Sequence, residues 1–317
     1  MDLPLITIGI TCYNAADTIG RAIEGALKQD YPNFEIVVVD DGSKDNSIEI
    51  IREKQKHSDK IRLIIHEQNK GFPSALNTMI ENAQGDLIAI FDDDDESHTD
   101  RIRKQCEAIE HYESNTKAEL VACYASLQKK YPNQYAVDFP AIGSRQKNPI
   151  GDDIVRYHLY LERDPDVFYG GGTPSCALMT RKSTFRTIGL YDPKLRRNED
   201  CDFAVRLGLH GGHIIGTKDF ILTQYASLGA DKKPHIARDS ELAFITKYKN
   251  ILDRYNRYEY AKDWINVRYY HFAGKKALAI AQIVKMTAKY PILTVKRFFK
   301  AAPKRLLHEW KMQKDAG

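Results

Sequence analysis

The first hundred residues alternate between short runs of branched apolar residues and segments whose apolar residues recur at helical spacing. The strand-like runs cover residues 5–11, 35–40, 62–66 and 87–91, and the helix-like segments cover 18–27, 47–56 and 74–82. Strands that are apolar throughout, rather than at every second position, are typical of parallel sheets covered on both faces. We therefore expect an α/β fold with a mostly parallel central sheet flanked by helices.

Beyond residue 100 the pattern is less regular. The expected helices cover 101–113, 154–161 and 201–210, the expected strands cover 120–127, 134–139 and 177–180, and a loop covers 169–174. From residue 240 the spacing is helical, and Pro291 and Pro303 divide the last stretch into short pieces.

Charge adds a boundary to this picture. The 317 residues carry a net charge of only +4, and 43% of them are hydrophobic, which is typical of an ordinary globular protein. Residues 240–317, however, hold 17 Lys and Arg against 6 Asp and Glu, so the rest of the chain is acidic. We expect one domain over 1–239, with halves 1–100 and 101–239, and a basic helical extension over 240–317.

The sequence also bears on the compartment. The five cysteines are scattered without a CxxC pair, which disfavours a disulfide framework and a zinc site. The N-terminus lacks a basic segment followed by an apolar one, and the longest apolar runs have only strand length. We expect a cytoplasmic protein, with contact to the inner face of the membrane left open.

Acidic residues cluster where two of the expected strands end. Asp40 and Asp41 follow one strand, and the four consecutive residues Asp92 to Asp95 follow another. In open parallel sheets, ligands bind beyond the carboxyl ends of the strands. A single aspartate there is often a turn or a helix cap, but four in a row repel one another and favour a divalent cation with oxygen ligands.

Several ordered motifs resemble those of a known family. They are Ile10-Thr-Cys-Tyr-Asn14, Val38-Val-Asp-Asp-Gly-Ser43, Asn69-Lys-Gly71 with Ala75 and Asn77, Gly85-Asp86 leading to Phe91-Asp-Asp-Asp-Asp95, and Gly189-Leu-Tyr-Asp192 followed by Asn198-Glu-Asp200. Their order and spacing are similar to those of family 2 glycosyltransferases with the GT-A fold. The resemblance covers about residues 6–225, and it implies that 1–100 binds a nucleotide-sugar and that 101–239 supplies the acceptor side and the catalytic base.

The resemblance assigns roles on the donor side. Thr11, Tyr13 and Asn14 would border the nucleotide, Asp41 or Asp40 would accept a hydrogen bond from the base, and Lys70 and Asn77 would face the nucleotide or its phosphates. A uracil base offers an N–H donor, so a carboxylate at this place suits a UDP-sugar.

It also assigns the metal and the base. Asp92, Asp94 and Asp95 align with the signature acidic positions, and Asp94 and Asp95 would contact the ribose and a Mn²⁺ or Mg²⁺ ion on the diphosphate. Which of the two carries the metal stays open. In the pair Glu199-Asp200, Asp200 aligns with the general base of an inverting transfer, although a helix N-terminus alone can also favour acidic residues.

Two further features refine the expected activity. Residues 224–228 do not match the "QxxRW" motif of processive members, which favours a non-processive enzyme, and Lys232, Lys233 or His235 could supply phosphate contacts or simply belong to a surface loop. Gly171, within Gly170-Gly-Gly172, could let the backbone approach the donor or acceptor closely, or could mark a turn without chemistry.

The basic extension suggests a partner. Between residues 275 and 310, apolar and aromatic residues are interspersed with many Lys and Arg, as in helices that lie on anionic lipid. Packing of the same apolar residues on the catalytic domain or on a second subunit is the alternative. The acceptor implied by the resemblance is a glycan or a lipid-linked molecule, and the oligomeric state is unknown.

Three other classes of protein share single features of this sequence but fit it less well. A haloacid-dehalogenase-like phosphatase also ends a strand in Asp-x-Asp, but there the motif follows the first strand, whereas Asp92 follows three strand–helix units. A non-catalytic protein whose basic tail binds nucleic acid fits the tail's apolar content less well than lipid does, so no nucleic acid is expected. A nucleotidyltransferase usually has a Gly-rich phosphate loop after the first strand, and residues 11–16 contain none.

Overall fold

The structure, a computed structural model, describes residues 3–133, 135–159, 163–226 and 233–297. The chain forms two compact units. The larger one holds the described residues up to Tyr225, apart from the short segments 130–136 and 159, and the smaller one holds these segments and the described residues from Ala226 onward. This division falls earlier than the expected boundary at residue 239, which lies inside helix α8 (Pro234–Lys247).

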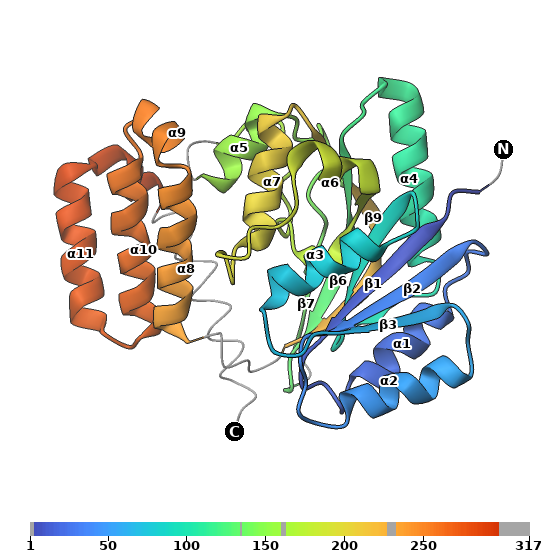
Figure 1. Ribbon diagram of the computed structural model, residues 1–317. Helices are drawn as coiled ribbons and strands as arrows, with labels where there is room; N and C mark the ends of the chain where they lie inside the picture. The colour runs from blue at the N-terminus through green and yellow to red at the C-terminus, as the bar shows by residue number, and fades with distance from the viewer. Residues whose placement is uncertain (1–2, 134, 160–162, 227–232, 298–317) are drawn as a thin grey trace. The chain divides into compact units, whose positions relative to one another are not determined.

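Four parallel strands form one half of the central sheet of the larger unit (Figure 1). In spatial order they are β3 (Ile61–Ile65), β2 (Phe34–Asp40), β1 (Ile6–Cys12) and β4 (Leu87–Asp92). Every residue of β1 is buried, including the polar residues Thr7 and Thr11, so this strand lies in the interior of the sheet. The register places Cys12 beside Asp40, and Thr11 beside Asp92. The acidic ends of β2 and β4 therefore flank the end of β1.

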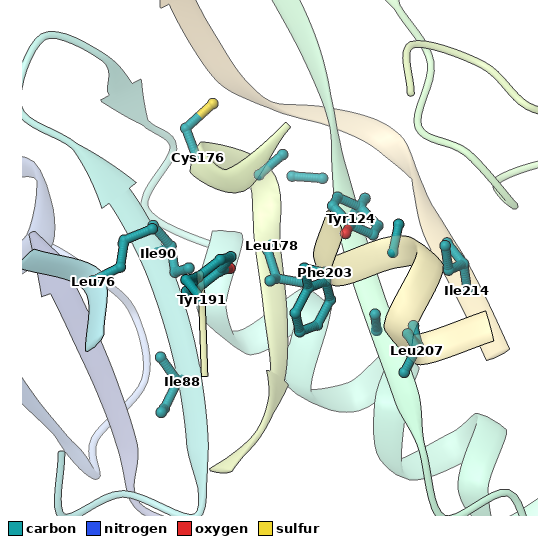
Figure 2. Close-up of a cluster of buried hydrophobic side chains, with 14 of the residues drawn as sticks. Leu76, Ile88, Ile90, Tyr124, Cys176, Leu178, Tyr191, Phe203, Leu207 and Ile214 are labelled. Atoms are coloured by element: carbon teal, nitrogen blue, oxygen red, sulfur yellow. The ribbon is translucent and has the colours of Figure 1, made fainter. Parts of the chain in front are cut away.

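Helices cover both faces of these strands. Ile36 and Val38 of β2 belong to an apolar cluster with residues of α1 (Ile19–Leu27), α2 (Ser47–Lys56) and α4 (Arg101–Thr116). Val37 and Val39 belong to a second cluster with residues of α3 (Phe72–Asn82), α5 (Asp152–His158), α6 (Lys182–Ile188) and α7 (Glu199–Leu209). Figure 2 shows part of this second cluster, where Phe203 of α7 lies near strand β8. The prediction of a parallel sheet covered on both faces is confirmed for β1 to β4.

The other half of the sheet contains antiparallel pairs. Strand β8 (Leu178–Arg181) runs antiparallel to β4 and to β6 (Val121–Lys130), and β5 (Glu96–Ser97) runs antiparallel to β9 (His213–Tyr225). Strand β7 (Ala136–Phe139) also pairs with β6, and the short 3₁₀ helix η1 (Ser175–Ala177) precedes β8. The antiparallel strands hold η1 next to the end of β4, because β8 leads away from that end.

The C-terminal unit is helical in its described part. It contains α8, α9 (Lys249–Arg254), α10 (Tyr258–Phe272) and α11 (Lys276–Lys289). Its core consists of Tyr260, Val267 and Met286, with Trp264 and Ile283 packed against them. The expected helical extension is thus observed as far as residue 297, and the part of the predicted lipid-binding segment beyond it, with Pro303, lies outside the described residues. Among the described residues, no helix combines the length and apolar content that crossing a membrane requires.

Several expected elements differ from the observed ones. The sequence patterns did not predict β5, α6 or β9, and β9 is the longest of the described strands at 13 residues. Helix α5 begins two residues before the expected helix and ends at His158, while residues 160–162 lie outside the described part of the chain. Strand β7 begins at Ala136 rather than at residue 134, which is also outside it.

Candidate active site

The loops that follow β1 and β2 are tied together by hydrogen bonds. The backbone N–H of Asn14 donates to Ser43 Oγ at 2.9 Å, and the N–H of Lys44 donates to Asn14 Oδ1 at 2.8 Å. The N–H of Ala16 donates to Asp45 Oδ2 at 3.0 Å. The Asn14 side chain therefore shapes the loop itself, while the neighbouring Tyr13 is 47% exposed and free to meet a ligand.

Asp40 has one satisfied and one unsatisfied carboxylate oxygen. Oδ1 accepts hydrogen bonds from the backbone N–H groups of Gly42 and Ser43, at 3.1 and 2.9 Å. Oδ2 is buried and has no hydrogen-bond partner among the described residues. The whole residue is fully buried. An unpartnered buried acceptor is costly, so Oδ2 is a candidate acceptor for an N–H of a ligand.

Asp41, by contrast, is engaged within the protein. Its carboxylate accepts hydrogen bonds from the backbone N–H groups of Lys70 and Gly71, at 2.9 and 2.8 Å, and Oδ1 lies 2.6 Å from Nδ1 of His66. His66 Nε2 lies 2.9 Å from Thr78 Oγ1, so the imidazole is held on both sides. Asp41 thereby fixes the loop that presents the exposed side chain of Lys70.

Gly42, between these aspartates and the next turn, cannot be replaced easily. Its φ is +79°, which favours glycine, and a Cβ there would lie 2.7 Å from the carbonyl carbon of Gln68. The close approach of the two loops brings the Asn69–Gly71 segment against Asp41. The glycine of the sequence motif thus has a packing reason in this structure.

A second acidic group lies where β4 ends. It contains a carboxylate oxygen of Asp92, a carboxylate oxygen of Asp95 and the Sγ atom of Cys176, and these three atoms lie within 4.8 Å of one another. Asp95 Oδ1 accepts a hydrogen bond from the N–H of Tyr225 at 3.2 Å, and Asp95 Oδ2 is buried with no partner among the described residues. Asp94 is not in this group, although its carbonyl accepts a hydrogen bond from Arg21 at 2.9 Å. The structure therefore brings together Asp92 and Asp95 of the predicted set and adds Cys176.

This group is short of positive charge. Burial, followed by the neighbouring carboxylates, raises the pKa of Asp93 to about 7, that of Asp95 to about 6, and that of Asp92 well above its ordinary value. The buried guanidinium of Arg101 lies nearby and donates hydrogen bonds to the carbonyls of Ile90 and Cys176, at 2.8 and 2.6 Å. One such cation does not neutralise several carboxylates, so the oxygen-rich group suits a divalent cation.

The third component is the pair Glu199-Asp200 at the N-terminus of α7. Ser175 Oγ donates a hydrogen bond to Glu199 Oε1 at 3.2 Å, and the N–H of Cys201 donates to Asp200 Oδ1 at 2.7 Å. Burial and the charge of Asp200 raise the pKa of Glu199 to about 8. Burial also raises the pKa of Asp200, against the opposing hydrogen bonds from Cys201. A pKa near 8 means that Glu199 largely holds its proton at neutral pH.

Helix η1 connects this pair to the acidic group, because Ser175 contacts Glu199 while its neighbour Cys176 adjoins Asp92 and Asp95. When it is ionised, Glu199 also adds to the raised pKa of Asp92, after burial and the nearer aspartates. Ser175, Cys176 and Arg101 had no motif that pointed to them in the sequence. His66 could have been noticed as a polar residue at the end of an expected strand.

Two other predicted site residues have structural contacts. Asn77 Nδ2 donates to the carbonyl of Tyr191, and the N–H of Tyr191 donates to Asn77 Oδ1, both at 2.8 Å. Gly171 is exposed, its N–H donates to the carbonyl of Pro140 at 2.9 Å, and a Cβ would lie 3.0 Å from Cβ of Phe139. Contact of either residue with a substrate stays a prediction.

Comparison with known proteins assigns the family. The model of the family described as "Glycosyl transferase family 2" matches residues 7–183, which is more than half of the chain. The chain belongs to glycosyl transferase family 2. The matched range contains the loops around Asp40 and Asp41, the Asp92–Asp95 cluster and η1, whereas Glu199 and Asp200 lie beyond it.

Two relatives from Bacillus subtilis (strain 168) illustrate the similarity. EpsE, which carries a provisional glycosyltransferase name, is 31% identical over 211 residues, covering 64% of this chain and 66% of EpsE. TuaG, provisionally named a teichuronic acid biosynthesis glycosyltransferase, is 35% identical over 104 residues, covering 33% of this chain and 41% of TuaG. The matched stretches thus span less than two thirds of either relative.

Solved structures support the fold. The crystal structure of S. aureus TarS 1-349 in complex with UDP-GlcNAc superposes with a TM-score of 0.58 at 17% sequence identity, covering 88% of this chain and 79% of that chain. At this identity the likeness concerns the fold alone. Together with the family match it confirms the predicted GT-A fold.

Proposed function

We propose that this chain is an inverting, divalent-cation-dependent and non-processive glycosyltransferase, which moves a sugar from a UDP-sugar to a hydroxyl of a glycan or lipid-linked acceptor. One observation carries the proposal. Two separate carboxylate sets, Asp92 with Asp95 and Glu199 with Asp200, adjoin the same short helix η1. One set suits a cation and a diphosphate, and the other suits the removal of a proton from an acceptor.

The donor's nucleotide is proposed to lie over the ends of β1 and β2. Asp40 Oδ2 is the buried acceptor available for the N–H of a uracil base, and Asp41 holds the loop of Lys70 in place. Thr11, Tyr13 and Asn14 border the same edge, and the ammonium of Lys70 would face the phosphates. The TarS structure, which has the same fold, was determined with UDP-GlcNAc, and this supports a UDP-sugar as the donor.

The residues at the end of β4 fit a divalent cation. Asp95 Oδ2 is a buried oxygen without a partner among the described residues, and burial together with the neighbouring carboxylates raises the pKa of Asp95. Asp92 and Asp95, which the structure brings together, would hold the ion, with Asp94 as the further ligand that the family resemblance implies, and oxygen ligands suit both Mn²⁺ and Mg²⁺. When bound, such an ion offsets the negative charge that develops on the leaving diphosphate.

Asp200 is proposed as the general base. Burial and the charge of Asp200 raise the pKa of Glu199 to about 8, so Glu199 is the poorer proton acceptor of the pair at neutral pH, and we assign the proton-accepting role to Asp200. Asp200 would accept the proton of the acceptor hydroxyl as its oxygen bonds to the anomeric carbon and the bond to the diphosphate breaks. A single displacement of this kind inverts the anomeric configuration.

The proposed setting is the assembly of surface polysaccharide or glycolipid at the cytoplasmic side of the membrane. TuaG is named for teichuronic acid biosynthesis, and this supports a polysaccharide acceptor for the present chain. Gly171 lies in the second half of the larger unit and is a candidate for close approach to the acceptor. Acidic residues dominate outside the extension, which agrees with the absence of nucleic acid from the proposed partners.

The test combines ligand binding with transfer. We would screen UDP- and GDP-sugars with Mn²⁺, Mg²⁺ or EDTA for thermal stabilisation, and then assay sugar transfer to membrane-derived acceptors. The Asp200→Asn variant should keep the stabilisation by the donor and lose about 10²- to 10⁴-fold in transfer rate. Exposed Asp152, changed to Asn, is the matched control. Hydrolysis of a phosphomonoester without any response to nucleotide-sugars would instead support the phosphatase alternative.

A further inference from the structure

The outward side of α11 is apolar. Its inward side, with Ala279, Ile283 and Met286, is buried or packs on the core of the helical unit. The opposite side presents five exposed residues at helical spacing, which we call the α11 stripe: Ala277, Ile280, Ala281, Val284 and Ala288. Ile280 and Val284 are each 63% exposed. The helix already buries its other apolar side in the core, so the exposed stripe is not needed for folding and is a candidate interaction surface.

Lysines border the α11 stripe on both sides. At 100° per residue, Lys276 lies along one edge of the stripe, and Lys285 and Lys289 lie along the other. The sequence contains no Asp or Glu between Asp263 and Glu309, so no acidic residue interrupts this surface along the chain. Such a surface is complementary to a partner that has a negatively charged outer layer above an apolar interior.

Exposed apolar residues continue just beyond the helix. Ile292 is 79% exposed and Val295 is 45% exposed, and Lys296 and Arg297 follow them. The same combination of apolar side chains and cations is therefore repeated one or two turns further along. This repetition lengthens the surface along the chain without adding any acidic group.

We propose that the α11 stripe docks on an anionic lipid surface. The aliphatic side chains would enter the boundary between headgroups and acyl chains, while the lysine stems extend so that their ammonium groups reach the lipid phosphates. Three of the five stripe residues are alanines, so the apolar contribution is modest and the cations supply much of the affinity. A second copy of the chain is a poorer occupant, because it would bring two sets of lysines together.

The proposal is independent of the glycosyl-transfer proposal, because lipid binding needs no catalysis. The experiment measures co-sedimentation of the full chain with phosphatidylcholine vesicles and with vesicles that also contain phosphatidylglycerol. We expect binding to the anionic vesicles that weakens as salt is added. The variant Lys276→Glu/Lys285→Glu/Lys289→Glu should partition at least about 100-fold less, since each lysine near an anionic surface contributes about 1 kcal/mol.

Controls separate this surface from general charge and from misfolding. Lys117→Glu/Lys218→Glu changes exposed lysines of the larger unit and should bind as the unchanged chain does. Ile280→Ser/Val284→Ser should weaken binding while the melting temperature is retained, because both side chains are exposed. Stabilisation by a nucleotide-sugar should be the same in all variants, so that its absence would count against the enzymatic proposal alone.

Three results would overturn the proposal. One is equal partitioning of the charge-reversed and unchanged chains. Another is equal binding to neutral and anionic vesicles. The third is self-association in lipid-free solution that Ile280→Ser/Val284→Ser abolishes, which would make the stripe an interface between copies of the chain.

Discussion

At the scale of single residues, adjacent aspartates at the end of β2 have different tasks. Asp41 accepts three hydrogen bonds within the protein, whereas Asp40 keeps a buried oxygen without a partner among the described residues. Leaving a buried acceptor unsatisfied costs about 1–3 kcal/mol. Because the unpartnered oxygen lowers the stability of the fold, its presence is more readily explained by a ligand that donates a hydrogen bond to it. The structure therefore favours Asp40 over Asp41 as the residue that contacts the base.

This difference predicts opposite behaviour of two conservative variants. Asp40→Asn keeps an oxygen for Gly42 and Ser43 but turns an amide N–H toward the base, so the KM for the donor should rise about 10-fold or more. Asp41→Asn should mainly lower the melting temperature, because it loses an acceptor for His66, Lys70 or Gly71. Donor KM and melting temperature of both variants check this. The reverse pattern would return the base contact to Asp41.

Glu199 gives a second residue-scale prediction, through pH. Its pKa is near 4.5 in the unfolded chain and about 8 in the folded chain. Between these values the unfolded chain has released the proton and the folded chain retains it, so stability falls as pH rises. Glu199→Gln keeps an acceptor for Ser175 but cannot ionise. We expect the variant to exceed the unchanged protein in stability at pH 8, by on the order of 1–3 kcal/mol.

Urea unfolding between pH 5 and pH 8.5 would measure this difference. Asp152→Asn, an exposed carboxylate, serves as the control and should follow the unchanged protein at every pH. If Glu199→Gln loses stability with pH as steeply as the unchanged protein does, Glu199 is not the group that retains the proton.

At the scale of elements, Asn77 joins α3 to the segment that leads into α7. Its amide makes two hydrogen bonds to the backbone of Tyr191, in the manner of a paired peptide group. Asn77→Ala should therefore lower stability by about 1–3 kcal/mol and lower kcat, with little change in the donor KM. Asn82→Ala, an exposed change on the same helix, is the control. A selective rise in donor KM would instead support the nucleotide contact that the family resemblance implies.

Elements also show how far sequence patterns reach. Helix α2 was predicted residue for residue from the helical spacing of its apolar residues, and β1 to β4 were predicted within one residue from their short runs rich in branched residues. Strand β9 was missed because Gly216, Lys218 and Asp219 interrupt its apolar pattern. The direction of β8 was not predictable either, because a fully buried strand has the same composition in a parallel as in an antiparallel pair.

In the candidate site, too, local features could be predicted from the sequence and long-range contacts could not. The acidic residues at strand ends could be located from the sequence. Charged residues directly after a buried parallel strand lie beyond its carboxyl end, which is the edge of the sheet where ligands bind. Cys176 and Ser175 could not, because they join Asp92 and Glu199 only through the folding of distant segments. Likewise, the hydrogen bonds that distinguish Asp40 from Asp41 come from loops that no local pattern specifies.

At the scale of the whole molecule, the near-neutral net charge of +4 combines an acidic body with a basic C-terminal region. Part of the acidic excess is concentrated in the Asp92–Asp95 cluster, where burial and repulsion raise the pKa values of Asp92, Asp93 and Asp95. Groups with raised carboxyl pKa values destabilise the folded state once they ionise. A bound divalent cation would remove this penalty by holding the ionised form.

The cation should therefore change the pH dependence of stability. In EDTA, the melting temperature should fall as pH rises from 5 to 7.5, since the unfolded carboxyls ionise near their ordinary pKa and those in the folded cluster ionise near 6 to 7. Mn²⁺ or Mg²⁺ should raise the melting temperature more at pH 7.5 than at pH 5, because only the ionised cluster binds the ion well. Differential scanning fluorimetry across this range would measure both trends.

Asp95→Asn should be less sensitive to pH in EDTA and should respond less to the cation, whereas Asp152→Asn should respond fully. A cation effect that is the same at both pH values, or that survives in Asp95→Asn, would place the ion elsewhere on the acidic body.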